Sequence, residues 1–204
     1  HGHLDLIGLA FQHGEADERV EGVGELVRCG VDDGAGIGPH HPRRPQTGPD
    51  DTPVVPHALE GNALAKSRYI HSATGLDVFA DDTGLEVDYL DGQPGVHSAR
   101  FAGPEKDSGA NIEKLLLLLG NTLNRRARFR TVIALISNGS EYLFEGTVNG
   151  TITGDRRGLE GFGYDPVFIP DGYDLTFAEM SLSEKNRISH RAMAFGRLKE
   201  FLEG

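Results

Sequence analysis

The sequence lacks several features that would indicate whole classes of protein. Cys29 is the single cysteine in 204 residues, so no internal disulfide can form, and a reducing compartment such as the cytoplasm is expected. No purely apolar run exceeds five residues, as in the leucines 115–119, whereas a membrane-spanning helix needs about 20. No basic segment precedes the apolar residues near the start, so no signal peptide is expected.

Basic side chains are also in the minority. Lys and Arg number 20 against 31 Asp and Glu, which gives a formal net charge of −11. A chain this acidic is poorly suited to bind a nucleic-acid polymer or an anionic membrane, so neither is expected as a partner. A small anion held in a local cationic pocket remains compatible with this charge. The length favours one domain, and 38% apolar with 25% charged residues is typical of a globular protein.

The composition changes abruptly near residue 58. Residues 1–56 contain no Lys, Ser, Asn or Tyr, but they hold six of the ten prolines and ten of the 28 glycines. We therefore divide the chain into an atypical Gly/Pro/His-rich segment, residues 1–57, and a domain, residues 58–204. The first segment is interpreted either as a linker-like or disordered arm or as a stretch read in a shifted frame. The abrupt change favours the second interpretation.

Apolar periodicity predicts a mixed α/β domain, with a sheet flanked by helices. A short strand is possible at Leu4–Leu9, and turn signals at Asn138-Gly139 and Asn149-Gly150 predict a three-stranded antiparallel meander. The predicted helices are 59–71 (ending near Gly75), 108–119 (closed by Gly120) and 183–202. The predicted strands are 76–80, 85–90, 127–136, 141–148, 151–153 and 167–169.

The segment Ala80–Gly84 contains two adjacent carboxylates after a predicted buried strand. Side chains alternate along a strand, so Asp81 and Asp82 are expected to point to opposite faces, one into a site and the other organising the loop. A carboxylate at this edge of an α/β sheet can hold a divalent cation or activate water. The alternative is an ordinary turn, because Asp and Gly are favoured turn residues.

A glycine-rich loop, residues 158–166, is the second candidate. Its glycines allow the backbone to approach a ligand closely, while Phe162 can stack on a flat ring and Asp165 can accept hydrogen bonds from ring N–H groups. The loop lacks the Lys-Ser/Thr of a Walker motif. The alternative is a tight loop whose aromatic side chains pack into the core.

Two basic groupings remain. Lys185, His190 and Arg191 cluster near the start of the last predicted helix, where backbone N–H groups also attract anions. The alternative there is a solvated helix face. Arg126, Arg128 and Arg130 alternate along a predicted strand, which indicates a solvated sheet face or a subunit contact.

Taken together, these segments resemble the inosine triphosphate pyrophosphatase (Ham1-like) family over about residues 58–203. The matching text, in the family's order, is Glu60-Gly61-Asn62-Ala63 with Lys66, 80–85, 94–100, 161–166, 177–179, Lys185-Asn186 and 189–192. The ordered set is far more specific than any one of its motifs.

The resemblance implies a Ham1/Maf-like fold and a Mg²⁺-dependent homodimer that hydrolyses ITP, dITP or XTP to the monophosphate and pyrophosphate. It implies that Asp82 is the general base and a metal ligand, that Thr83 touches the substrate and that Lys66 faces the phosphates. It also implies that Lys185 contacts the substrate and that His190 and Arg191 read the 6-oxo group. The implied base pocket consists of Phe162, Gly163, Tyr164 and Asp165.

The sequence departs from the family at one place. Family members open with a strand and a Thr/Ser-x-Asn-x-x-Lys loop that cradles the triphosphate, and residues 1–57 contain no Lys or Asn. The family's acidic metal ligand falls near Val54-Val55, where no carboxylate stands. A non-catalytic purine-nucleotide-binding protein and an interaction protein with an acidic arm are therefore the alternative functions.

Overall fold

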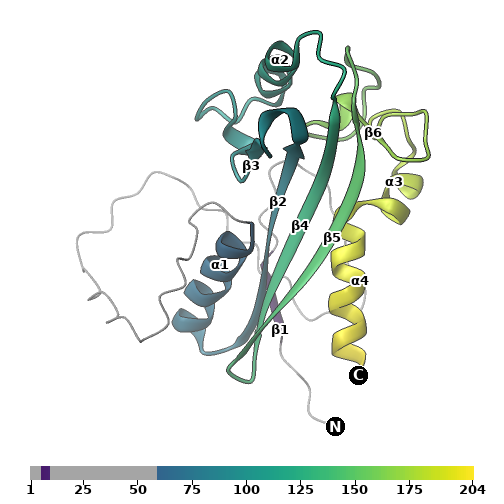
Figure 1. Cartoon of the computed structure of the whole chain (residues 1–204). Helices are drawn as coiled ribbons and strands as arrows, with labels where there is room; N and C mark the ends of the chain where they lie inside the picture. The colour runs from purple at the N-terminus through teal and green to yellow at the C-terminus, as the bar shows by residue number, and fades with distance from the viewer. Residues whose placement is uncertain (1–5, 10–58) are drawn as a thin grey trace.

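The computed structural model describes residues 6–9 and 59–204 (Figure 1). The segment predicted for residues 1–57 lies outside these residues apart from Leu6–Leu9. The strands are β1 (Leu6–Leu9), β2 (Asp77–Val87), β3 (Pro94–Gly95), β4 (Arg126–Ser137), β5 (Ser140–Ile152) and β6 (Phe168–Pro170). The α-helices are α1 (Leu59–Thr74), α2 (Ser108–Leu119), α3 (Leu182–Ile188) and α4 (His190–Glu203). No helix in these ranges is long and apolar enough to cross a membrane.

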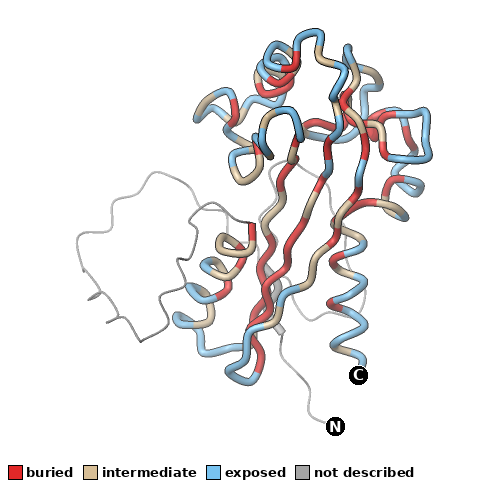
Figure 2. The backbone as a smooth tube through the Cα atoms, viewed as in Figure 1, coloured by how far each residue is buried: buried red, intermediate tan, exposed pale blue. Residues whose placement is uncertain are grey.

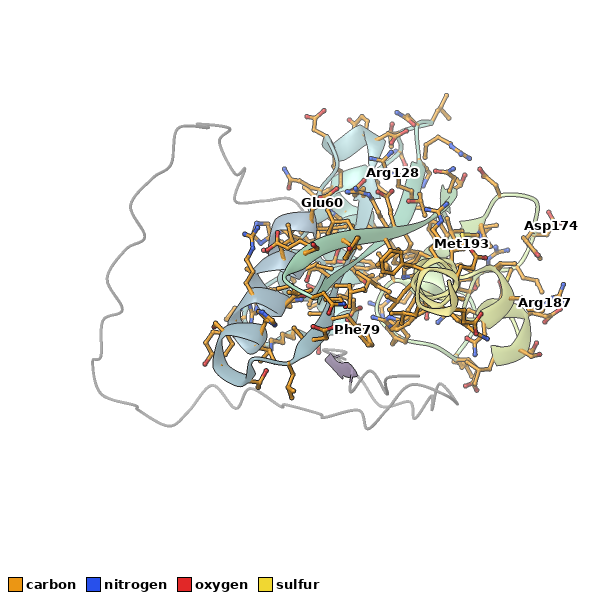
Figure 3. The ribbon with its side chains drawn as sticks, turned by 90° about the horizontal axis from the view of Figure 1, so that it is seen from below. Glu60, Phe79, Arg128, Asp174, Arg187 and Met193 are labelled. Atoms are coloured by element: carbon orange, nitrogen blue, oxygen red, sulfur yellow. The ribbon has the colours of Figure 1, made fainter. Side chains whose placement is uncertain are left out.

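The sheet has the strand order β1-β2-β4-β5-β6, with β3 also paired to β2. Strand β1 runs parallel to β2, and all other pairs are antiparallel. Helix α1 packs on one face of the sheet and α4 on the other, as the labelled Glu60 and Met193 show in the view of Figure 3. The predicted mixed α/β fold and the helix that ends near Gly75 are thus confirmed, and the short strand that the sequence allowed at Leu4–Leu9 forms over Leu6–Leu9.

Both faces are buried along residues 78–81 of β2 and 131–137 of β4 (Figure 2), because successive side chains pack into different cores. On the α1 face, Val132 and Ala134 pack against Leu59 and Ala63. The other face carries two cores in succession. The core under α4 consists of Phe79, Ile133, Leu135, Ala194 and Leu198. The core under α2 and residues 164–180 includes Leu85, Val87, Phe129, Leu115, Phe168 and Phe177.

The prediction of two separate strands at 76–80 and 85–90 is wrong. Strand β2 continues through Asp81-Asp82-Thr83-Gly84, in unbroken register with β4 from Val78 opposite Ile136 to Val87 opposite Ala127. Long-range pairing therefore overrides the local turn preference of these residues. As a result, the two carboxylates lie in the middle of a strand and not at its end.

The predicted three-stranded meander is also wrong at its second turn. The Asn138-Gly139 turn is present, with φ of 50° and 75°, but β5 runs straight through Asn149-Gly150. A Cβ on Gly150 would lie 2.2 Å from the carbonyl oxygen of Ile169, so this glycine permits the close approach of β6. The third strand of the antiparallel set is β6 and not residues 151–153.

The helix predicted over 183–202 is two helices. Ser189 is extended (φ −69°, ψ 147°) and its hydroxyl accepts a hydrogen bond from the Ala192 N–H, which caps α4. The break places His190 and Arg191 in the first turn of α4.

The basic side chains of β4 alternate on one face as expected, and each is neutralised by carboxylates. The partners are Asp171 for Arg126, Glu86 for Arg128, and Glu60 with Glu145 for Arg130. The Arg130 guanidinium lowers the pKa of the Glu145 carboxyl to about 2. Because Glu60 lies in the first turn of α1, Arg130 ties this helix to the sheet.

Helix α4 begins directly on β5 at Gly146. A Cβ on this glycine would lie 1.9 Å from the His190 carbonyl oxygen and 2.6 Å from the Ala194 nitrogen, both backbone atoms of α4. Any side chain at position 146 would meet these backbone atoms. The glycine therefore allows the first turn of α4 to lie this close to the sheet.

We expect Gly146→Ala to lower the free energy of unfolding by about 1–3 kcal/mol, the usual cost of overpacking, because α4 must move. Urea unfolding measures the change. The control is Gly196→Ala, since Gly196 is an exposed position of α4 with no atom near its would-be Cβ. This variant should be neutral or stabilised by up to about 1 kcal/mol. Equal stability of the two variants would contradict the expected clash.

Candidate functional site

Asp82 points to the α1 face of the sheet, where α1 supplies two partners. Its Oδ1 accepts a hydrogen bond from Lys66 Nζ at 2.5 Å, and its Oδ2 accepts one from Asn62 Nδ2 at 3.0 Å. Asn62 and Lys66 are four residues apart, so they share one side of the helix. Lys66 also donates to the main-chain carbonyl of Asp81 at 2.8 Å. The Asp82 side chain stays 15% exposed, which leaves it accessible to solvent and ligand.

Asp81 and Thr83 point to the opposite face, as the alternation predicted. Asp81 is 3% exposed and pairs with Arg191, whose Nη2 lies 3.3 Å from Asp81 Oδ2. The Thr83 hydroxyl lies 2.7 Å from that of Thr131 on the neighbouring strand. One strand therefore presents Asp82 to α1 and Asp81 to α4.

The two faces of the sheet meet at the outer edge of β2. Strand β1 pairs with β2 as far as Ala80, and β3 pairs with it from Leu85 onward. Between these points, the outer edge at residues 81–84 has no paired strand within the part of the chain that the structure describes. A ligand lying across this edge could touch the Asp82 group on one face and the α4 group on the other.

Asp165 organises the loop of residues 158–166 from inside. Its Oδ2 accepts hydrogen bonds from the Phe162 N–H at 2.8 Å and from Lys185 Nζ at 2.6 Å. Burial raises the pKa of Asp165, and the Lys185 ammonium partly offsets this rise. Gly161 has φ of +81°, and a Cβ there would lie 2.3 Å from Asp165 Oδ2, so the turn requires glycine.

The two aromatic residues of this loop behave differently. Phe162 is 48% exposed, and Lys185 Nζ lies 4.4 Å from its ring centroid, so the ring is partly open to a ligand. Tyr164 is buried, its hydroxyl donates to the Ser98 carbonyl at 2.9 Å, and burial raises its pKa. Only its main chain, with that of the neighbouring Gly163 (φ +59°), can line a pocket. The prediction of a ring that can stack on a ligand therefore fits Phe162, and the alternative, an aromatic side chain packed into the core, fits Tyr164.

His190 is held against the core at the start of α4. It is 5% exposed, and its ring stacks on Phe129 at 4.9 Å and 14°. Burial lowers its pKa to about 3, with smaller contributions from the charges of Arg191 and Lys185. The imidazole is therefore neutral at physiological pH. Its Nδ1 is buried without a hydrogen-bond partner, and the same holds for Arg191 Nε and Asp81 Oδ1.

The structure brings predicted residues together in two places: Asp82 contacts Lys66, and Lys185 contacts both Asp165 and Phe162. Arg191 pairs instead with Asp81, which was not predicted as a site residue. Asn62 and Asp81 were missed as site residues. Asn62 could have been found from its spacing of four residues from Lys66. Strand alternation placed Asp81 on the opposite face from Asp82 but did not indicate its partner.

The residues around Asp82 suit a metal that shares its ligands with a substrate. In the two described ranges, no group of three or more His, Cys, Asp or Glu side chains could hold an ion alone. Mg²⁺ is commonly bound by one or two carboxylates together with substrate phosphates and water. The partly exposed carboxylate of Asp82 fits that arrangement.

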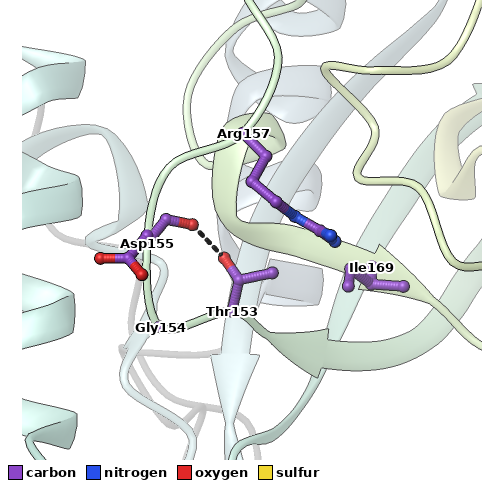
Figure 4. A pocket seen from close by; sticks show the side chains of 5 residues that line it. All are labelled: Thr153, Gly154, Asp155, Arg157 and Ile169. Carbon is purple, nitrogen blue, oxygen red and sulfur yellow. Dashed lines mark hydrogen bonds between the residues drawn. The ribbon is translucent and has the colours of Figure 1, made fainter.

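A separate shallow pocket of about 300 Å³ lies beside β6 (Figure 4). It is lined by Thr153, Gly154, Asp155, Arg157 and Ile169. The Thr153 hydroxyl donates to the Asp155 carbonyl across its wall at 2.7 Å. None of the predicted site residues lines this pocket.

Known proteins with similar sequences include two dITP/XTP pyrophosphatases. A dITP/XTP pyrophosphatase of Porphyromonas gingivalis is 53% identical over 154 residues, which cover 75% of this chain and 79% of the relative. One of Christiangramia forsetii is 50% identical over 153 residues, covering 75% and 80%.

Solved structures are similar as well. The Ham1 protein of Staphylococcus aureus aligns with a TM-score of 0.71 at 47% identity, covering 72% of this chain and 77% of that one. A nucleoside-triphosphatase/dITP/XTP pyrophosphatase of Mycobacterium abscessus aligns with a TM-score of 0.68 at 36% identity, covering 95% and 98%. The sequence model of the Ham1 family matches residues 48–201. The chain therefore belongs to the Ham1 family.

Proposed function

We propose that this chain is a nucleoside-triphosphate pyrophosphatase that hydrolyses non-canonical purine nucleotides such as dITP, ITP and XTP. The observation that carries the proposal is the outer edge of β2 at residues 81–84. Among the described residues this edge has no paired strand, and it has Asp82 and Lys66 on one face and Arg191 and His190 on the other. Relatives about 50% identical to the chain bear the name dITP/XTP pyrophosphatase, which supports this substrate class. The reaction removes such nucleotides from the nucleotide pool.

In the proposed reaction, water attacks the α-phosphorus and the α–β anhydride bond breaks, which yields the monophosphate and pyrophosphate. Asp82 orients the water and takes its proton, while Asn62 and Lys66 hold the carboxylate in place. Lys66 also faces the phosphates, and Thr83 touches the substrate. Mg²⁺, held by Asp82 and the phosphate oxygens, would neutralise charge on the triphosphate and polarise the α-phosphorus.

The base is proposed to bind at the start of α4. The exposed ring of Phe162 stacks on the purine, and Asp165 with the main chain of Gly163 and Tyr164 completes the pocket. Lys185 contacts the substrate from behind Phe162.

Discrimination follows from the donors that face the 6-position. Arg191 can only donate, and the neutral His190 can also donate, so a 6-oxo group satisfies both residues. A 6-amino group would leave the Arg191 donors unpaired, at a cost of about 1–3 kcal/mol for each, whereas the neutral His190 has an acceptor nitrogen as well as a donor.

We further propose that the enzyme is a homodimer in the cytoplasm. The family resemblance supports the dimer, and the single cysteine is compatible with a reducing compartment. The alternative of a non-catalytic nucleotide-binding protein depends on the missing loop motif in residues 1–57, and no observation in the described part of the chain favours it.

We expect Asp82→Asn to reduce Mg²⁺-dependent pyrophosphate release from ITP at least about 100-fold, because the amide cannot accept the proton of water. A coupled pyrophosphate assay measures the rate. Asp91→Asn is the matched control, since Asp91 is an exposed turn residue with φ of 51°, a conformation that Asn tolerates, and it should keep full activity. Wild-type protein that binds ITP without releasing pyrophosphate would instead support the nucleotide-binding alternative.

We expect the free energy of unfolding to fall by about 2 kcal/mol between pH 7 and pH 5 because of His190 alone. Its pKa is about 3 in the fold and 6.5 in the unfolded chain, so the unfolded chain binds more protons below pH 6.5. The stability is therefore present above pH 6.5 and is lost as the pH falls toward 3. Urea unfolding of wild type and His190→Gln at both pH values measures it. Parallel losses in the two proteins would contradict the assignment.

A further inference from the structure

Asp81 is a buried ionisable side chain that lies between two apolar cores on one face of β2. On the same face of the strand, Phe79 and Leu85 are fully buried, and each belongs to one of the two cores on that face. Asp81 is buried to nearly the same degree, between those cores. Replacing a buried ion pair by apolar residues is often neutral or stabilising, so Asp81 is not explained by stability.

Arg191 is the group that Asp81 holds. The guanidinium donates from Nη2 to Asp81 Oδ2 at 3.3 Å, and this is its one polar contact within residues 59–204. Arginine has several rotatable bonds, and an unheld side chain loses conformational entropy whenever it binds a ligand. The carboxylate of Asp81 therefore fixes where the Arg191 donors lie before a ligand arrives.

Several polar atoms at this pair make no hydrogen bond within the described residues. Asp81 Oδ1, Arg191 Nε and His190 Nδ1 are all buried and have no hydrogen-bond partner in the described ranges. Buried polar atoms nearly always have partners, so unsatisfied ones need an explanation. Two of these atoms belong to the contacting pair Asp81 and Arg191, and the third belongs to His190, which precedes Arg191 in the chain. Their grouping indicates a place where a polar ligand completes the hydrogen bonding.

We propose that Asp81 is a positioning residue that sets base specificity by fixing Arg191 at the base pocket. The inference rests on the proposed function. Asp81 neutralises the guanidinium and orients it, so that Arg191 donates to a 6-oxo purine without first being recruited from solvent. The main chain of Asp81 is fixed independently, because Lys66 donates to its carbonyl from the other face.

The test compares Asp81→Asn with wild type on ITP and ATP. We expect kcat/KM for ITP to fall about tenfold or more, the range for a hydrogen bond from a charged donor, while the value for ATP stays within about twofold. The fall should appear in KM, because Asp82 and Lys66 are unchanged. Calorimetry with IMP and AMP should show the same loss of preference without any turnover.

Asp77→Asn is the matched control on the same strand. Asp77 accepts hydrogen bonds from the Ser137 hydroxyl at 2.6 Å and the Asn138 N–H at 3.1 Å, so the variant loses contacts of the fold without touching Arg191. It should lower Tm and leave the ITP/ATP ratio unchanged. A double-mutant cycle with Arg191→Met should show that Asp81→Asn has no further effect on the ratio once Arg191 is gone.

An unchanged ITP/ATP ratio in Asp81→Asn, together with an active wild type, would overturn the inference. An inactive wild type would overturn the proposed function instead, and the IMP/AMP preference would then decide the inference alone. If Asp81→Asn does not fold, Asp81→Glu replaces it. The extra methylene moves the carboxylate and should also lower the ratio, and an unchanged ratio would again overturn the proposal.

Discussion

Two neighbouring carboxylates in one strand, each paired with a cation from a different helix, connect the parts of this fold. Strand alternation sends Asp82 to α1 and Asp81 to α4, where Lys66 and Arg191 meet them. Between β1 and β3, the outer edge of this strand is unpaired in the described part of the sheet, so a ligand could reach both faces there. The residue proposed for phosphate chemistry, Asp82, and the residue proposed to support base recognition, Asp81, are therefore neighbours in the sequence.

Rigid elements hold the rest of the site. Asp165 uses one oxygen to fix both the main chain at Phe162 and the ammonium of Lys185, so the exposed ring is supported from below by a buried ion pair. Gly146 allows the first turn of α4 to lie directly on β5. Groups placed this way need little reorganisation on binding, which is the property that electrostatic preorganisation requires.

Sequence reasoning succeeded where local chemistry decides structure and failed where distant contacts do. The Asn138-Gly139 turn formed because both residues tolerate positive φ, whereas Asn149-Gly150 stayed extended because β6 approaches Gly150 closely. The Asp-Asp-Thr-Gly segment looked like a turn, but β4 pairs with it along its whole length. The alternation of Asp81 and Asp82 was predictable from strand geometry alone. The partner of Asp81 was not, since Arg191 lies 110 residues away.

The long sequence separation between Asp81 and Arg191 affects the order in which contacts form during folding. Asp82 and Lys66 are 16 residues apart, so their contact closes a short loop, whereas the contact between Asp81 and Arg191 closes a very long one. Contacts of low sequence separation form early, and distant ones wait until the intervening chain is ordered. We therefore expect a folding chain to form the contact between Asp82 and Lys66 before the contact between Asp81 and Arg191.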